Sequence, residues 1–367
     1  MSYHEPANYV ESVNNFPWNQ RFYLKLDKEV HPFNEPDRFR PLDRAYDGKT
    51  TFWSTPSPEP DLNDAFWHDV EYTFKDKIKS DLTQNIGSRS KDVPASSNLK
   101  DSSLIGNAAQ NLASSVLQLY PNPEKIIFVS ILRAGVPITE WLCQMMPGAV
   151  GAALSLFVGI GIDKVALAAV ERDFPDRTVI FVDGWTGKGG VAREIEKLNK
   201  GPLAVLVDPW GWADFAGVRE DIFCPSACFT GLATLGFSRT FVVDSNDLFS
   251  AYRFSEYFAK KTIVESWQQC TPLYNPQSAT AIFNTKVSSS KRFYADTNLR
   301  IHSNEVCRAL INAAPEKILF ADDKQFGEEH FPILLKLAEQ RGVVSQFNVN
   351  YLKDIKTKVA CKLYGKL

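Results

Sequence analysis

One stretch of the chain, Thr178 to Glu196, contains residues whose types and spacing could bind a phosphate group. It reads TVIFVDGWTGKGGVAREIE: an apolar run to Val182, then Asp183, a glycine-rich segment, and apolar residues at helical spacing. The pattern predicts a buried strand that ends at Asp183, followed by a ligand loop and a helix. Such a loop directs backbone N–H groups and the positive end of the helix dipole at one point, where a phosphate binds.

The predicted loop combines three kinds of phosphate-binding residue, namely glycines, a hydroxyl and a cation: Gly187, Gly189, Gly190, Thr186 and Lys188. A nucleotide-kinase loop of the Walker A type is excluded. That loop needs a glycine five positions before its Gly-Lys pair and a Ser or Thr after it, and this sequence has Val182 and Gly189 there.

A second candidate loop lies about fifty residues earlier in the chain. A strand predicted from Lys125 to Ser130 runs into the letters ILRAGVP, and a helix follows. Arg133 could counter an anionic group, and Ala134 with Gly135 forms a tight turn. The same letters also fit an ordinary turn between a strand and a helix, with Arg133 in solvent.

The two loops, in this order, resemble the ligand loops of phosphoribosyltransferases, and ILRAG is most similar to the uracil-specific members. The resemblance implies that Asp183 holds the ribose hydroxyls. It implies that Gly184 and Thr186 to Gly189 cradle a 5-phosphate, and that Arg133, Ala134 and Gly135 bind pyrophosphate together with Mg²⁺ brought by the ligand. The usual signature has a second acid where Gly184 stands and a threonine where Gly189 stands, so a nucleotide or a modified ribose phosphate stays open as the ligand.

The letters VDGWTGKG, PSAC and SRT, spread over roughly residues 100 to 285, resemble proteins of bacterial tellurium-resistance and stress operons often labelled cysteine protease StiP. This resemblance implies a C-terminal Pelota-like RNA-binding domain and a role in making a nucleoside-like stress metabolite. Ser238 and Arg239, just before a predicted strand, could line the base side of the pocket. A glycine-rich helix packed on the sheet explains that segment equally well.

The protease label can be tested against the residues. A catalytic cysteine needs a base, usually histidine, to raise its thiolate fraction. All five histidines lie outside residues 100 to 285, so Cys228 or Cys270 could find one only from the arm or the tail. The pair Cys224 and Cys228 lacks further ligands of the kind a structural zinc site needs.

The composition excludes several classes of protein. A chain of 367 residues with 44% hydrophobic residues and a net charge of −2 has a full core and no overall attraction to nucleic acid or membrane. No apolar run reaches the length of a spanning helix, and the start lacks a signal peptide, so we expect a cytoplasmic location with reduced cysteines.

The fold class expected is α/β, a phosphoribosyltransferase-type parallel sheet with helices on both faces plus a small C-terminal α/β/α domain. The predicted domains are a wrapping arm at 1–95, the main domain at 96–285 and the small domain at 295–367. Residues 286–367 hold 14 Lys or Arg and 9 Asp or Glu, a net +5, which suits either RNA or a solvated surface. A homo-oligomer stays open.

Three hypotheses for function follow. The first is an enzyme that makes or breaks an N-glycosidic bond at a ribose 5-phosphate, with Asp183 stabilising charge that develops on the ribose. The second is a non-catalytic nucleotide sensor whose tail engages RNA or a partner. The third is a cysteine protease.

Overall fold

The computed structural model describes residues 18–29, 52–53, 100–158, 161–224, 226–227, 237, 240–242, 248–253, 267–268, 271–283, 298–312 and 315–363. Four residues singled out in the sequence lie outside these ranges: Ser238, Arg239, Cys228 and Cys270.

The main domain is built on a sheet of six parallel strands in the order β1-β5-β4-β8-β9-β10. The strands are β1 (Arg21–Phe22), β4 (Ile126–Ile131), β5 (Val150–Leu154), β8 (Thr178–Trp185), β9 (Leu203–Val207) and β10 (Phe215–Val218). All residues of β4 and β9 are buried, which is why both sequences are almost continuously apolar. The predicted α/β class with a parallel sheet is confirmed.

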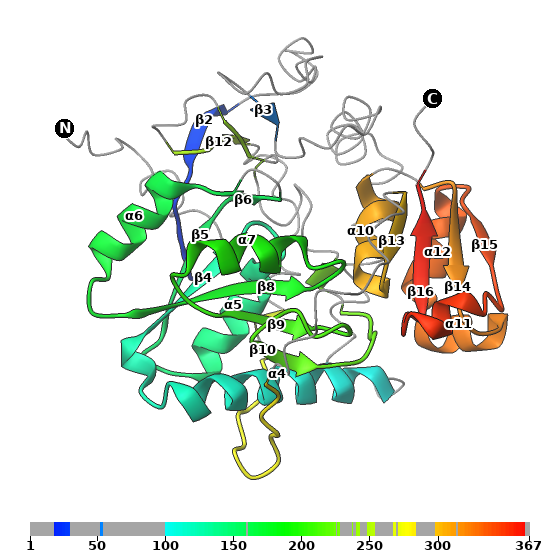
Figure 1. Ribbon diagram of the computed structural model, residues 1–367, viewed down its shortest axis with the longest axis horizontal. Coiled ribbons are helices and arrows are strands. Elements are labelled where there is room, and N and C mark those ends of the chain that lie inside the picture. The colour runs from blue at the N-terminus through cyan, green and yellow to red at the C-terminus, as the bar shows by residue number, and fades with distance from the viewer. Residues whose placement is uncertain are drawn as a thin grey trace.

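Helices cover both faces of this sheet (Figure 1). They are α4 (Lys100–Leu119) and α5 (Gly135–Met145) on one face, and α6 (Lys164–Asp173) and α7 (Gly190–Leu198) on the other. Successive side chains of β4 point to opposite faces of the sheet. Ile126 and Phe128 pack with α4 and α5, whereas Ile127 and Val129 pack with α6 and α7. The layered arrangement leaves the carboxyl ends of the strands as the edge where loops meet.

The segment at residues 18–29 joins two sheets. Its β1 extends the main sheet beside β5, and β2 (Lys25–Glu29) belongs to a four-stranded sheet in the order β2-β12-β11-β3. The other strands there are β3 (Phe52–Trp53), β11 (Phe241–Val242) and β12 (Ser250–Arg253), and a hairpin of β6 (Leu156–Phe157) and β7 (Gly161–Ile162) precedes α6. Two described parts of the predicted N-terminal arm therefore act as strands.

The C-terminal domain, described over residues 298–312 and 315–363, has its own sheet in the order β13-β16-β14-β15. Its elements are β13 (Leu299–Ile301), α10 (Ser303–Asn312), β14 (Lys317–Phe320), α11 (Lys324–His330), α12 (Pro332–Gln340), β15 (Val344–Gln346), α13 (Tyr351–Asp354) and β16 (Val359–Lys362). The predicted small α/β domain is confirmed. Helices α11 and α12 are separate, because Pro332 begins a new helix after α11 ends at His330.

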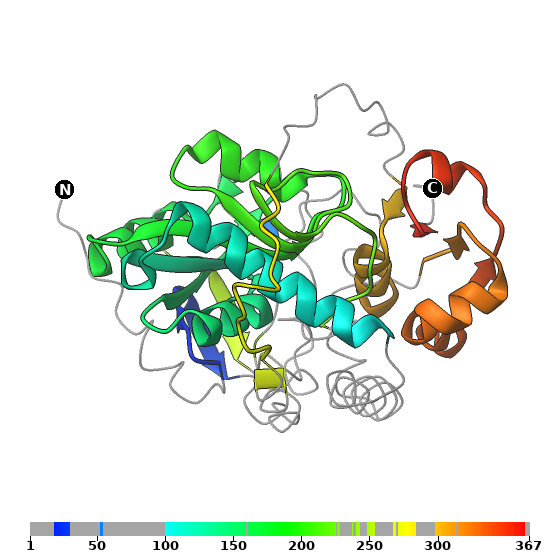
Figure 2. The same ribbon diagram turned by 90° about the horizontal axis from the view of Figure 1, so that it is seen from below.

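The C-terminal domain lies against the main domain through α10. Both views place α10 between the main domain and the rest of the C-terminal domain (Figures 1 and 2). One hydrophobic cluster runs across the boundary, from Ile222 and Phe223 to Val306 and Leu310. Within the described parts of the chain, no helix is both long and apolar enough to span a bilayer.

Candidate functional site

The two predicted loops lie side by side at the carboxyl edge of the sheet. A Cβ atom on Gly135 would lie 2.1 Å from the carbonyl oxygen of Val182, and one on Gly184 would lie 3.1 Å from the carbonyl oxygen of Ala134. Glycine is therefore required at Gly135, and it lets the two backbones pack closely at Gly184. The structure brings the segments Arg133–Gly135 and Asp183–Gly184 together.

Arg133 is buried in this arrangement. Only 8% of the residue is exposed, so the alternative in which Arg133 sits in solvent is wrong. The peptide bond between Leu132 and Arg133 is cis. A buried guanidinium at the edge of a parallel sheet is suited to an anionic group of a ligand.

Asp183 lies inside β8, not after it as the sequence predicted, because β8 continues its pairing with β9 as far as Trp185 and Val207. The residue is 9% exposed, and its Oδ1 accepts the N–H of Gly184 at 2.8 Å. Burial raises the pKa of Asp183 from 3.8 to about 7, although the Gly184 N–H and the charge of Arg308 oppose the rise. Asp183 can thus exchange a proton near neutral pH.

The glycine loop ends at the N-terminus of α7. Gly189 caps the helix in the left-handed conformation, with φ of 77°, and a Cβ there would lie 2.4 Å from the Trp212 ring. The first N–H groups of a helix have no partner within it, and the helix dipole makes that end positive. Lys188 is half-buried in the same loop. The predicted phosphate-binding segment thus leads into a helix N-terminus, and its binding of phosphate stays a prediction.

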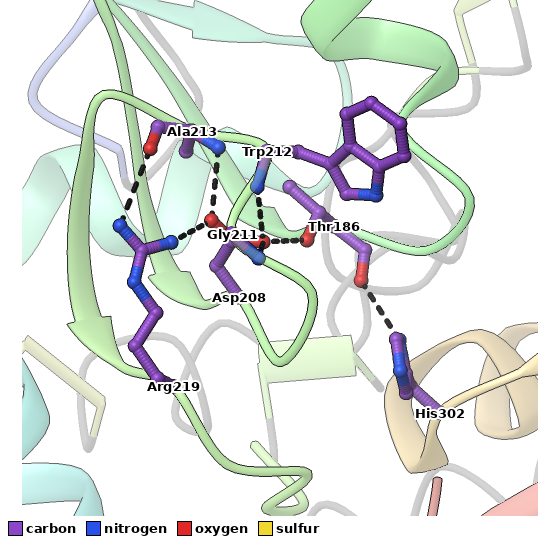
Figure 3. A network of polar contacts seen from close by, with 7 residues as sticks. All are labelled: Thr186, Asp208, Gly211, Trp212, Ala213, Arg219 and His302. Carbon is purple, nitrogen blue, oxygen red and sulfur yellow. Dashed lines mark hydrogen bonds and ion pairs between the residues drawn. The ribbon is translucent and has the colours of Figure 1, made fainter. Parts of the chain in front are cut away.

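Thr186 has a different role from the predicted one (Figure 3). Its hydroxyl donates to Asp208 instead of pointing into the loop, and its backbone N–H donates to Val207. Asp208, which follows β9, also accepts the N–H groups of Gly211, Trp212 and Ala213 and the guanidinium of Arg219. The hydroxyl predicted to bind phosphate therefore fixes the glycine loop to the aromatic loop at 208–213.

The start of α10 contacts the glycine loop directly. The Nε1–H of Trp185 donates to Glu305 at 2.8 Å, and a Cβ on Gly187 would lie 3.0 Å from Glu305 Cγ. His302 Nδ1 lies 3.2 Å from the carbonyl oxygen of Thr186 (Figure 3), which can only accept, so Nδ1 carries the proton. Burial lowers the pKa of His302, although Asp221, Asp208 and Glu305 oppose the shift, so the ring is neutral.

Several buried polar contacts hold the C-terminal domain in this place. Asp221 accepts the N–H and hydroxyl of Ser303 at the start of α10, and the N–H groups of Lys358 and Val359. Asn304 pairs with the backbone of Ile222 and Cys224 at 2.9 and 2.7 Å. Trp210 donates to the carbonyl of Ile355 and packs in a hydrophobic cluster with residues of the C-terminal domain such as Leu319 and Leu352. These contacts fix the position of the C-terminal domain beside the candidate site.

Sequence reasoning missed the residues that the C-terminal domain brings to the site, including Glu305 and Arg308. No local signal marks them, since the Trp185–Glu305 contact spans 120 positions. Asp208 could have been found, because an acid directly after a parallel strand lies at the ligand edge of the sheet. Asp163 is a buried cap of α6 that accepts the N–H groups of Ala166 and Phe249.

The described cysteines do not resemble catalytic thiols. Burial raises the pKa of Cys224 to about 11 and that of Cys143 to about 12. Cys224 Sγ lies 2.9 Å from Ser226 Oγ, a contact in which either atom can donate. Among the described residues, no three His, Cys, Asp or Glu side chains gather as metal ligands. The predicted base-side pair, Ser238 and Arg239, lies outside the described ranges.

Two groups of known proteins are similar to this chain, StiP proteins and uracil phosphoribosyltransferases. The family model described as "Tellurite-like stress resistance cysteine protease StiP" matches residues 92–267. The chain is similar to the StiP family. Cysteine protease StiP of Acinetobacter baylyi is 31% identical over 135 residues, covering 33% of this chain and 35% of that protein. No solved structure matches the chain.

Uracil phosphoribosyltransferases match as well. The enzyme of Sinorhizobium medicae is 35% identical over 113 residues, 27% of this chain and 52% of that protein. The enzyme of Legionella pneumophila subsp. pneumophila is 34% identical over 113 residues, 27% of this chain and 50% of that protein. The chain spans about a third to a half of the length of these StiP and phosphoribosyltransferase relatives. The similarity agrees with the resemblance of ILRAG to the uracil-specific members.

Proposed function

We propose that this protein binds a ribose 5-phosphate ligand of the phosphoribosyl diphosphate type at the carboxyl edge of its main sheet and acts on an N-glycosidic bond. One observation carries the proposal: Asp183, the glycine loop at the start of α7, and the buried Arg133 turn lie together at that edge. The 5-phosphate would accept hydrogen bonds from the backbone N–H groups that follow Gly187, beside Lys188. Similarity to uracil phosphoribosyltransferases supports the choice of ligand.

Only a few groups of this chain would take part in the reaction. The Asp183 carboxylate would accept hydrogen bonds from the ribose hydroxyls and stabilise positive charge as the C1–oxygen bond to pyrophosphate breaks. A ring nitrogen of the base would bond to C1 and release its proton to solvent. Arg133 and the Ala134 and Gly135 amides would hold the leaving pyrophosphate. Mg²⁺ would enter bound to the diphosphate, where it neutralises charge on the leaving group. Thr186 contributes by holding the loop in shape through Asp208.

Isothermal titration with phosphoribosyl diphosphate and Mg²⁺ tests the binding step. We expect the wild-type protein to bind, and Asp183→Asn to bind more weakly because an amide is a poorer acceptor than a carboxylate for the ribose hydroxyls. Affinity for the wild type should rise as pH increases through about 7, the pKa of Asp183. Asp176→Asn, in the exposed turn before β8, is the matched control. Equal affinity for wild type and Asp183→Asn would rule out the ribose contact.

Turnover is tested separately. The protein is incubated with phosphoribosyl diphosphate, Mg²⁺ and single bases, beginning with uracil, and products are detected by mass spectrometry. A new nucleotide together with released pyrophosphate supports transfer. Tight binding without product would instead favour a nucleotide sensor.

The sensor is a second candidate because α10 touches the ligand loop. Glu305 and His302 contact residues 185–187. A ligand bound in the loop would therefore alter the contacts of the C-terminal domain with it. That domain would then act on a partner, and its basic tail makes RNA the first choice to test. Filter binding over a salt series checks this: affinity that falls with salt in the full chain supports RNA binding, and no retention of RNA refutes it. Light scattering with and without ligand measures whether the response is a change in oligomeric state.

A further inference from the structure

The face of α10 that meets the ligand loop bears a cation. His302 directly precedes α10, and Glu305 and Arg308, three positions apart in the helix, lie on one side of it. The first two contact Thr186, Trp185 and Gly187, as described above. Arg308 comes one turn after Glu305, and its charge acts on Asp183, whose pKa it lowers. Arg308 therefore lies on the side of α10 that carries Glu305, close enough to Asp183 for its charge to act on that carboxyl group.

The guanidinium of Arg308 is half-buried, yet no hydrogen bond or ion pair links it to any residue that the structure describes. Three other half-buried arginines have such partners. Arg219 binds Asp208, Arg177 donates to two backbone carbonyls, and Arg341 donates to Leu310. A guanidinium has five N–H donors in a planar fork, and a half-buried one without an internal acceptor is arranged for an external one.

The neighbouring acids explain why the guanidinium stays available. Glu305, three positions earlier on the same helix, already accepts the indole N–H of Trp185. Asp183 is buried and accepts the N–H of Gly184. Burial favours its protonated form, which has no full charge to pair with a cation.

We propose that Arg308 is a ligand-binding residue of this site, supplied by the C-terminal domain, and that it takes a phosphate or diphosphate group of the ligand held at Asp183 and the glycine loop. The proposal rests on the proposed function. The planar fork matches two phosphate oxygens at once, which lysine cannot do. The site is then complete only with the C-terminal domain docked, and a bound ligand would join the two domains.

Titration of the full-length protein with three ligands tests this proposal: inorganic pyrophosphate, ribose 5-phosphate, and phosphoribosyl diphosphate with Mg²⁺. We expect Arg308→Gln to bind the diphosphate-bearing ligands roughly ten- to a hundredfold more weakly than wild type, because it loses charge-assisted hydrogen bonds. Arg308→Lys should recover only part of that affinity, since it restores the charge without the fork. Lys324→Gln, an exposed cation on α11, removes the same charge from the same domain and should bind as wild type does.

The outcomes separate this proposal from the one on which it rests. Equal affinity of wild type and Arg308→Gln for phosphoribosyl diphosphate would overturn the role of Arg308 and leave the proposed function standing. Pyrophosphate binding that depends on Arg308, without any binding of either ribose ligand, would keep Arg308 and overturn the proposed function. Absence of binding of all three ligands to the wild type overturns both. Thermal unfolding of each ligand-free variant verifies that it is folded before titration.

Discussion

Replacing Asp183 by asparagine should make the protein more stable at alkaline pH while weakening its ligand binding. A carboxyl whose pKa rises from 3.8 to about 7 on folding is ionised in the unfolded chain before it is ionised in the folded one. Between those two values the folded state binds more protons, so its stability falls as pH rises and levels off above about 7. At about 1.4 kcal/mol per pH unit, ionised Asp183 costs the folded protein at most roughly 4 kcal/mol.

Asparagine removes this cost because it is never ionised, and its side-chain oxygen can still accept the N–H of Gly184. We therefore expect the urea midpoint of Asp183→Asn to lie above that of wild type by up to about 1 M at pH 8.5, where wild-type Asp183 is ionised. At pH 5, about one unit above the unfolded pKa, wild type has lost only about 1.6 kcal/mol of this total, so the difference between the two midpoints should be less than half of that at pH 8.5. The comparison between the two pH values isolates ionisation from any change in packing.

Urea titrations followed by tryptophan fluorescence at both pH values make this measurement. Asp176→Asn, an exposed acid near the other end of β8, is the control and should leave the midpoint unchanged at both pH values. If Asp183→Asn shifts the midpoint equally at pH 5 and pH 8.5, the carboxyl does not titrate near neutrality in the folded protein and the reasoning fails.

Four substitutions and one labelling experiment have defined outcomes. Gly342→Ala adds only left-handed strain, since nothing lies within 4 Å and φ is 65°, and should lower stability by about 1 kcal/mol. Gly189→Ala should lower it by about 2–4 kcal/mol, because its Cβ also meets an indole ring; equal urea midpoints for the two variants would refute the collision. Glu305→Gln should bind ribose 5-phosphate several-fold more tightly by calorimetry, since a negative charge leaves the loop; unchanged affinity refutes that repulsion. Asp221→Ala should loosen the C-terminal domain by about 3 kcal/mol and speed its proteolytic release, whereas a wild-type cleavage rate would refute the anchoring role. Cys224 in the native protein should resist iodoacetamide at pH 7 and should react after denaturation, as measured by mass spectrometry. Rapid labelling of the native protein would support the cysteine protease hypothesis.

The main sheet could be predicted because its signals are local. Leu203–Val207 is a strand made only of apolar residues, and Ile126–Ile131 differs by one residue at each end from the strand expected at Lys125 to Ser130. Both are short apolar runs enclosed by turn residues, a pattern that buried parallel strands require. The positions of the two candidate loops followed from the same logic, since a loop after a parallel strand can only lie at the carboxyl edge.

The rest depends on contacts between distant residues. Thr186 looks like a phosphate ligand in sequence, but its single hydroxyl hydrogen is given to Asp208, 22 positions later. The strand that was expected to stop at Asp183 continues because Trp185 pairs with Val207, which no reading of β8 alone can show. The contact of α10 with the loop is further still, since it needs the docked position of the whole C-terminal domain.

The contact between Trp185 and Glu305 links the evolutionary histories of two domains. An indole N–H at position 185 is useful here because an acid from α10 accepts it, and Gly187 is held small by the same acid. Among related sequences, we expect the residues at 185, 187 and 305 to change together. Relatives without a C-terminal domain would be released from this constraint, so their loops should tolerate other residues at 185. The contact could therefore be recognised by covariation without any structure.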